Sequence, residues 1–117
     1  MSLLIEEQRQ ILKILYPTRH TEYQELLEPL ASIVEKEIYP SAAEIDRTGT
    51  FPEKQIRELF RMGFTAIPFP REYGGLGLPT PVYTAAMEIV AKGCASTALS
   101  TSIHGTVCEG LLHFGSE

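Results

Sequence analysis

Apolar residues recur at intervals of three and four along most of this chain of 117 residues, and no segment alternates apolar and polar residues as a strand does. Pro29 and Pro40 interrupt the longest pattern, for which we expect one bent helix or two collinear helices. The pattern therefore predicts an all-α fold, an orthogonal or up-down bundle of about five helices. The expected helices cover residues 4–15, 21–47, 51–63, 80–93 and 96–114.

Residues that favour helix ends lie at the limits of these segments. Ser41 indicates a restart after Pro40, while Gly63 and Gly93 are expected to end two of the helices. The expected N-terminal caps are Thr21, Thr50, Thr80 and either Ser96 or Thr97. The buried sides of the first and fourth helices are expected to include Leu4, Ile5, Gln8, Ile11, Leu12, Leu15, Val82, Ala86, Ile89 and Val90.

Residues 64–80 contain three prolines and three glycines, and they separate the helices as a central loop. A residue before proline is driven to extended backbone, so we expect an ordered loop here rather than a helix. Gly74-Gly75-Leu76-Gly77 follows no strand and lacks the Gly-x-Gly-x-x-Gly spacing of a phosphate cradle. We interpret these glycines as a tight turn with positive φ angles.

Composition and charge exclude several classes of protein. Hydrophobic residues make up 44% and charged residues 21%, as in globular domains. A net charge of −5 opposes binding to nucleic acid, and no apolar stretch is long enough to cross a membrane. Cys94 and Cys108 form no disulfide framework or zinc spacing, and Met1–Glu7 shows no basic targeting segment. We therefore expect a reduced, cytoplasmic protein with no membrane span.

The last helical segment has no Lys, Arg, Asp or Glu between Lys92 and Glu109. A surface helix would carry charged residues on one side, so we expect this helix to be buried on both sides, with further protein beyond these residues. Its core side is expected to be Leu99, Ile103, Val107, Leu111 and Phe114. The opposite side consists of the small, uncharged residues Ala98, Thr101, Ser102, Gly105 and Cys108.

No residue of this chain forms an evident reaction centre. His104 lacks a carboxylate to orient it, and we expect it to be a buried imidazole. Cys94 and Cys108 have no basic neighbour in the sequence that would favour the thiolate, so we expect both to pack in the core.

Several motifs occur in an order that resembles the acyl-CoA dehydrogenase family. The central one is Ile67-Pro68 followed by Tyr73-Gly74-Gly75-Leu76-Gly77-Leu78. The stretches 37–46 and 51–64 are similar to the preceding helices of that family, and 87–105 is similar to the following pair. The resemblance implies an N-terminal α domain at 21–117. Residues 1–20 have no clear counterpart and form an extension helix that could cover another subunit.

The same resemblance implies an FAD-dependent oxidoreductase of fatty acid metabolism that dehydrogenates the α,β bond of an acyl-CoA. Family enzymes carry the catalytic base in a later helical bundle and most flavin contacts outside this domain, so this portion alone is expected to be inactive and without FAD. Alignment with medium-chain members places Ala98, Leu99 and Ser102 on the wall of the acyl-chain cavity. The implied partners are acyl-CoA, an electron-transfer flavoprotein or similar acceptor, and further copies in a homo-oligomer.

Two alternatives remain open at this stage. An acyl-CoA oxidase or a flavin monooxygenase of the same fold would share this N-terminal domain. The alternative from another class is a free-standing helical interaction module without catalysis. The extent of the reading frame beyond Glu117 distinguishes the module from the enzymes.

Overall fold

The computed structural model describes residues 5–116, and most of these residues are helical, as the periodicity of the sequence predicts. No strand occurs among these residues, so the predicted all-α fold is confirmed. The α-helices are α1 (Glu6–Leu15), α2 (His20–Ile33), α3 (Tyr39–Thr48), α4 (Glu53–Arg61), α5 (Thr80–Gly93) and α6 (Ala95–Phe114). Three short helical segments lie between them: η2 (Val34–Ile38), η3 (Phe64–Ala66) and η4 (Arg71–Tyr73).

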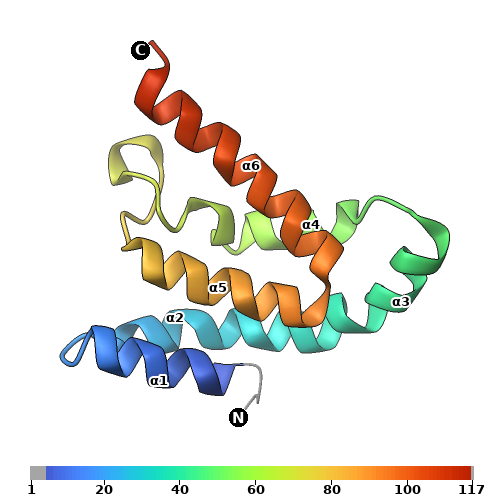
Figure 1. Ribbon diagram of the computed structural model, residues 1–117, viewed down its shortest axis with the longest axis horizontal. Helices are drawn as coiled ribbons and strands as arrows, with labels where there is room; N and C mark the ends of the chain where they lie inside the picture. Colours follow the sequence, from blue (N-terminus) through green and yellow to red (C-terminus); the bar gives the residue numbers. More distant parts are fainter. Residues whose placement is uncertain (1–4, 117) are drawn as a thin grey trace.

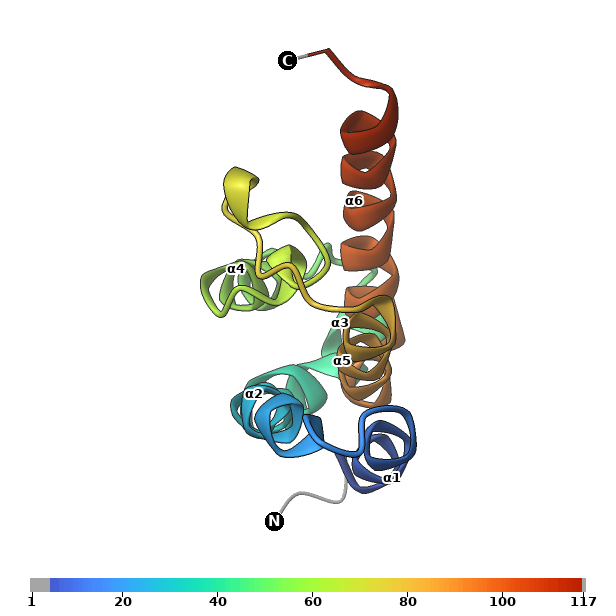
Figure 2. The ribbon, with the colours of Figure 1, turned by 90° about the vertical axis from the view of Figure 1, so that its left-hand side faces the viewer.

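The helices form a flat plate with extents of 39 × 39 × 18 Å. Helices α1, α2 and α5 pack against one another, and α6 starts at the end of α5 and runs within the plate toward the edge opposite α1 and α2 (Figure 1). The side view shows that α6 carries the C-terminus to the far end of the molecule from α1 (Figure 2). Half of α6 therefore extends beyond the helices that form the core.

The longest predicted pattern forms one continuous bent run of α2, η2 and α3. Pro29 lies inside α2, and Pro40 occupies the first turn of α3. Proline lacks an N–H and clashes with the carbonyl four residues back, and here the preceding turn widens. The Tyr39 N–H donates to the carbonyl of Val34, five residues back, which is π-helical geometry. This structure agrees with the expected bent helix that restarts at Pro40.

Helix α5 supplies the centre of the core. Val82, Ala86, Ile89 and Val90 are all fully buried, as their helical spacing predicts. They pack with side chains from the α2–η2 run and with Leu12 of α1. Because a methyl group at Gly93 would lie 2.4 Å from Val34 Cγ1, the glycine is what allows α5 and η2 to approach so closely.

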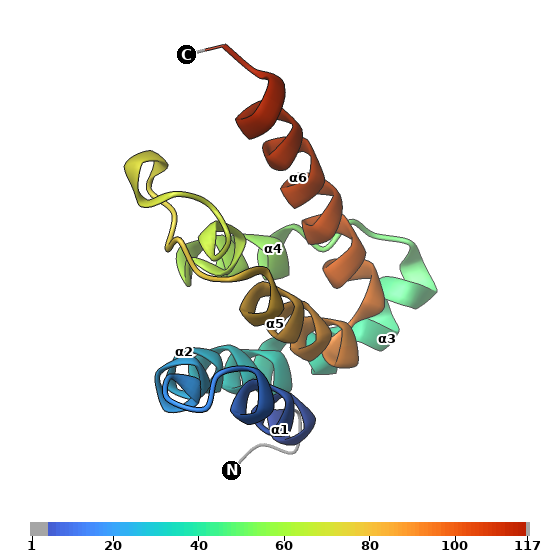
Figure 3. The ribbon, with the colours of Figure 1, turned by 60° about the vertical axis from the view of Figure 1, so that its left-hand side comes forward.

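Helix α1 packs on α2 and α5 of its own chain (Figure 3). Gln8 is buried, and its Nε2 donates a hydrogen bond of 2.8 Å to Glu88 Oε2 of α5. Lys92 of α5 forms an ion pair of 3.0 Å with Glu7. The expected buried side is only partly correct, because Ile11 and Leu15 are half exposed. Leu4 lies outside the described residues.

The predicted N-terminal caps of α2, α4, α5 and α6 are all wrong. The residues before α2, α4, α5 and α6 are Arg19, Pro52, Pro79 and Cys94, and none makes a side-chain capping bond. Helices α2 and α6 begin one or two residues before the predicted caps, and α5 begins at the predicted cap Thr80 itself, so those hydroxyls lie inside the first turn. Thr50 instead hydrogen-bonds the Thr48 hydroxyl at 2.7 Å, and Ser41 donates to the Ile38 carbonyl.

The loop between α4 and α5 is held by its own backbone hydrogen bonds. Leu76 N–H donates to the Ala66 carbonyl at 2.9 Å, and Gly77 N–H donates to Phe69 at 2.8 Å. Gly74 and Gly77 have φ angles of 85° and 63°, which confirms the predicted tight turn. A methyl group at Gly75 would lie 2.0 Å from the Phe69 carbonyl oxygen. In residues 5–116 no helix has the length and apolar character needed to span a membrane.

Candidate functional site

Helix α6 packs on the rest of the chain through its small residues. Thr97, Ala98, Thr101 and Gly105 are buried, and they form what we call the inner face. A methyl group at Gly105 would lie 2.9 Å from the Tyr83 hydroxyl oxygen, so the glycine lets α5 approach α6 closely. Small side chains on the inner face therefore replace the large ones that usually join two helices.

The large apolar side chains of α6 point away from the chain. Leu99 is 63% exposed and Phe114 is 91% exposed. The sequence-based assignment of this stripe to the core is wrong, whereas its burial by further protein stays a prediction. The exposed stripe consists of Leu99, Ile103, Val107, Leu111 and Phe114, and we call it the outer face.

The polar groups along α6 do not offset this apolar exposure. Ser100 donates to the Ser96 carbonyl at 2.9 Å, and Thr106 donates to the Ser102 carbonyl at 3.0 Å. Hydroxyls that bond to their own helix carbonyls offer no free donor to water or to a ligand. The outer face is therefore a continuous apolar surface, of the kind that marks an interaction or ligand site.

The three residues predicted to line an acyl cavity lie on different sides of α6. Ala98 is buried on the inner face, and Leu99 is on the outer face. Ser102 is half-buried at the border between the two faces. Only Leu99 and Ser102 are thus open to a ligand that approaches from the outside.

His104 and Cys108 depart from their expected burial. His104 is exposed, and its ring meets the edge of Phe60 at a centroid distance of 5.0 Å. Cys108 is half-buried, with its Sγ 3.4 Å from His104 Nε2. Cys94 alone is buried as expected. The spacing of four residues between His104 and Cys108 on a helix could have revealed this pair from the sequence.

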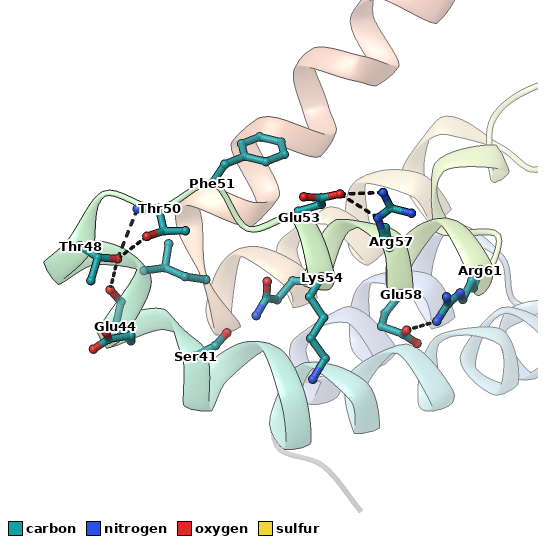
Figure 4. A pocket seen from close by; sticks show the side chains of 12 residues that line it. Ser41, Glu44, Thr48, Thr50, Phe51, Glu53, Lys54, Arg57, Glu58 and Arg61 are labelled. Carbon is teal, nitrogen blue, oxygen red and sulfur yellow. Dashed lines mark hydrogen bonds and ion pairs between the residues drawn. The ribbon is translucent and has the colours of Figure 1, made fainter.

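Two open grooves border the helices that carry these residues. One, of about 820 Å³, lies between the central loop and the C-terminal half of α6. The other, of about 710 Å³, lies between α3 and α4 (Figure 4). In the second groove, Glu53 pairs with Arg57 at 2.6 Å and Glu58 pairs with Arg61 at 2.5 Å, all within α4. These exposed pairs are typical of a solvated helix surface, so we assign no site to this groove.

Comparisons with known proteins place this arrangement in context. Residues 20–117 match the model for "Acyl-CoA dehydrogenase, N-terminal domain". The chain is 38% identical over 96 residues to the mitochondrial short-chain specific acyl-CoA dehydrogenase of Homo sapiens, covering 81% of this chain and 23% of that protein. It is 39% identical over 97 residues to a probable acyl-CoA dehydrogenase, YngJ, of Bacillus subtilis, covering 82% and 26%. The chain thus spans about a quarter of the length of these relatives.

Proposed function

Since this chain belongs to the acyl-CoA dehydrogenase family, as its N-terminal domain, we propose that it is part of an FAD-dependent enzyme that dehydrogenates an acyl-CoA thioester. In this proposal α6 contributes one wall of the cavity that holds the acyl chain. Ser102 and Leu99 face the chain directly, and Ala98 shapes the wall from behind.

The observation that supports this role is the outer face of α6. It is apolar and exposed, and its hydroxyl neighbours are engaged with their own helix. Burial of an apolar chain against it would gain roughly 25 cal/mol for each Å² removed from water. Such a surface suits a fatty acyl chain, or the protein elements that enclose one, better than it suits a polar ligand.

The glycine loop does not offer the flavin a set of free backbone amides. A flavin diphosphate needs free backbone amides, and the best candidates are those of the glycine loop. The amides of Gly75, Leu76, Gly77 and Leu78 all donate to carbonyls within the loop. We therefore assign FAD to other parts of the protein and derive no step of the flavin chemistry from this chain.

The remaining partners follow from the family and are part of the proposal. They are an electron-transfer flavoprotein or similar acceptor, and further copies of the chain in a homo-oligomer. The relatives include mitochondrial enzymes, so the cytoplasmic location expected from the sequence stays a prediction, which fractionation of the producing cell would test.

The full-length protein provides the first test. We expect it to be yellow and to lose its flavin absorbance under anaerobic conditions when an acyl-CoA is added. A flavin that reacts first with oxygen or NADPH would favour the oxidase or monooxygenase alternative. A colourless full-length protein would contradict the proposal and favour the interaction module.

Substitution of Ser102 by Phe tests the cavity wall. In the full-length enzyme we expect kcat/KM to fall for long acyl groups and to survive for short ones, because each excluded methylene loses about 0.8 kcal/mol of burial. The matched control is Ala43→Phe, which places the same ring at an exposed position of α3, off the proposed wall. If Ser102→Phe lowers activity equally at every chain length, Ser102 merely packs between helices and the assignment fails.

A further inference from the structure

Helix α6 also carries a thiol and an imidazole in contact, and the proposed function uses neither. Cys108 Sγ lies 3.4 Å from His104 Nε2. With the ring proton on Nδ1, Nε2 accepts the thiol proton, which is the arrangement that activates a cysteine nucleophile. The contact follows from their spacing of four residues, which places both side chains on one side of α6.

Side chains from two other helices, α4 and α5, lie beside this pair. The ring of Phe60 of α4 lies edge-on to His104, with an interplanar angle of 83°, and restricts the imidazole. Tyr83 of α5 is close enough to Cys108 for the thiol to contribute to its raised pKa, although burial of the phenol is the larger cause. The Tyr83 ring in turn stacks on Phe64 at 5.7 Å. The pair is thus bordered by α4 and α5 on one side, and the exposed His104 ring leaves it open to solvent on the other.

An open groove begins at this pair. His104 and Cys108 both line the groove of about 820 Å³ between the central loop and α6. Large apolar and aromatic side chains line the rest of this groove, together with the polar side chains of Thr65 and Glu72. The apolar part consists of Phe69, Tyr73, Leu111 and Leu112. A nucleophile at the edge of an apolar groove fits an electrophile that carries a hydrocarbon chain.

We propose that Cys108 is an acylation site that takes a fatty acyl group from an acyl-CoA thioester, with His104 as the base. His104 Nε2 removes the thiol proton, and Cys108 Sγ attacks the thioester carbonyl carbon. The bond from that carbon to the coenzyme A sulfur then breaks, and the leaving thiolate takes the proton from His104. One thioester is exchanged for another, so the step needs no oxidant or reductant.

The identity of the acyl donor rests on the proposed function, whereas the nucleophile rests on the geometry of the pair. The competing occupant of the groove is the part of the protein outside this chain, because Leu111 also belongs to the outer face. If that part covers the groove, Cys108 is protected in the full-length protein and no acylation occurs.

The test is incubation of the full-length protein with octanoyl-CoA, followed by intact mass and peptide mapping. We expect the mass of one octanoyl group on Cys108, removable by neutral hydroxylamine. Cys108→Ser should abolish the label, and Cys94→Ser, at the buried cysteine, should leave it unchanged. His104→Gln should slow labelling roughly 100-fold, as expected when a general base is lost. Acetyl-CoA, which has no chain for the groove, should label far more slowly.

Three results would overturn the proposal: absence of label on Cys108, a label confined to Cys94, or equal labelling in His104→Gln. Thermal unfolding of each variant shows whether the fold is retained, and Cys108→Ala provides a second removal of the thiol if Cys108→Ser unfolds. Flavin bleaching is measured in the same samples. Labelling without bleaching contradicts only the proposed dehydrogenase, and bleaching without labelling contradicts only the acylation.

Discussion

Helices α5 and α6 follow one another in the chain and contact each other, yet they use their apolar residues in opposite ways. On α5 the large side chains, such as Ile89 and Val90, are fully buried and the helix is central to the core. On α6 the buried residues are small, and the large side chain of Ile103 is 57% exposed. Apolar spacing therefore shows that a helix has a face to bury, without showing which neighbour will cover it.

A matched pair of substitutions gives the largest expected difference between the two helices. In this chain, Ile89→Ala should lower the free energy of unfolding by about 2–5 kcal/mol, because it leaves a cavity in the core. Ile103→Ala should change it by less than about 0.5 kcal/mol, because the side chain is exposed. Urea unfolding measures both.

The same two substitutions, Ile89→Ala and Ile103→Ala, can be compared in the full-length protein by their effect on the free energy of unfolding. If other parts of the enzyme cover the outer face, Ile103→Ala should become destabilising there. Equal effects of Ile89→Ala and Ile103→Ala in the isolated chain would contradict the difference in burial between the helices.

The close approach of α5 to η2 gives an intermediate effect. Gly93→Ala should destabilise the chain by about 1–3 kcal/mol, because the new methyl group collides with Val34 Cγ1. Val34→Ala removes that atom, so the double variant should be more stable than the sum of the two single changes predicts. Additive effects would show that the contact between α5 and η2 does not limit their approach. The readout is again the urea midpoint.

A smaller effect is expected at Tyr83, where α5 meets α6. Burial raises the pKa of its phenol above the ordinary value of 10.0, so the folded chain favours the neutral form. The stabilising contribution is complete below pH 10.0 and is lost as the pH rises through the raised pKa. Tyr83→Phe should reduce this loss, whereas Tyr39→Phe, on an exposed side chain, should not. Identical pH profiles for the two variants would contradict the expectation.

Local features of the fold could be predicted where the cause lies within a few residues. Pro40 predicted the restart of the long helix, and the glycines predicted the turn at residues 74–77. The buried side of α5 was also predicted, because its neighbours α1 and α2 belong to the same chain. The N-terminal caps were not predicted correctly, since a shift of a helix start by one to three residues changes the local sequence pattern little.

The candidate site was less predictable, for a physical reason. The lack of charge on α6 indicated that both of its sides are to be covered, which stays a prediction for the outer face, but periodicity favours the large residues as the core. The structure instead buries the small residues Ala98 and Gly105, and at Gly105 a side chain would collide with the Tyr83 hydroxyl. The contact between His104 and Cys108 was detectable from their spacing, whereas the groove beside it depends on the path of a distant loop.

The one-sided attachment of α6 has a consequence for how the chain opens. From Ala95 to Gly105 the helix has a buried face, whereas no residue from Thr106 to Ser116 is buried. Helix ends without tertiary support exchange their amide protons with solvent through local opening, at little free-energy cost. Protection from exchange should therefore fall along α6 after Gly105, and the half that carries Cys108 should open without unfolding of the core.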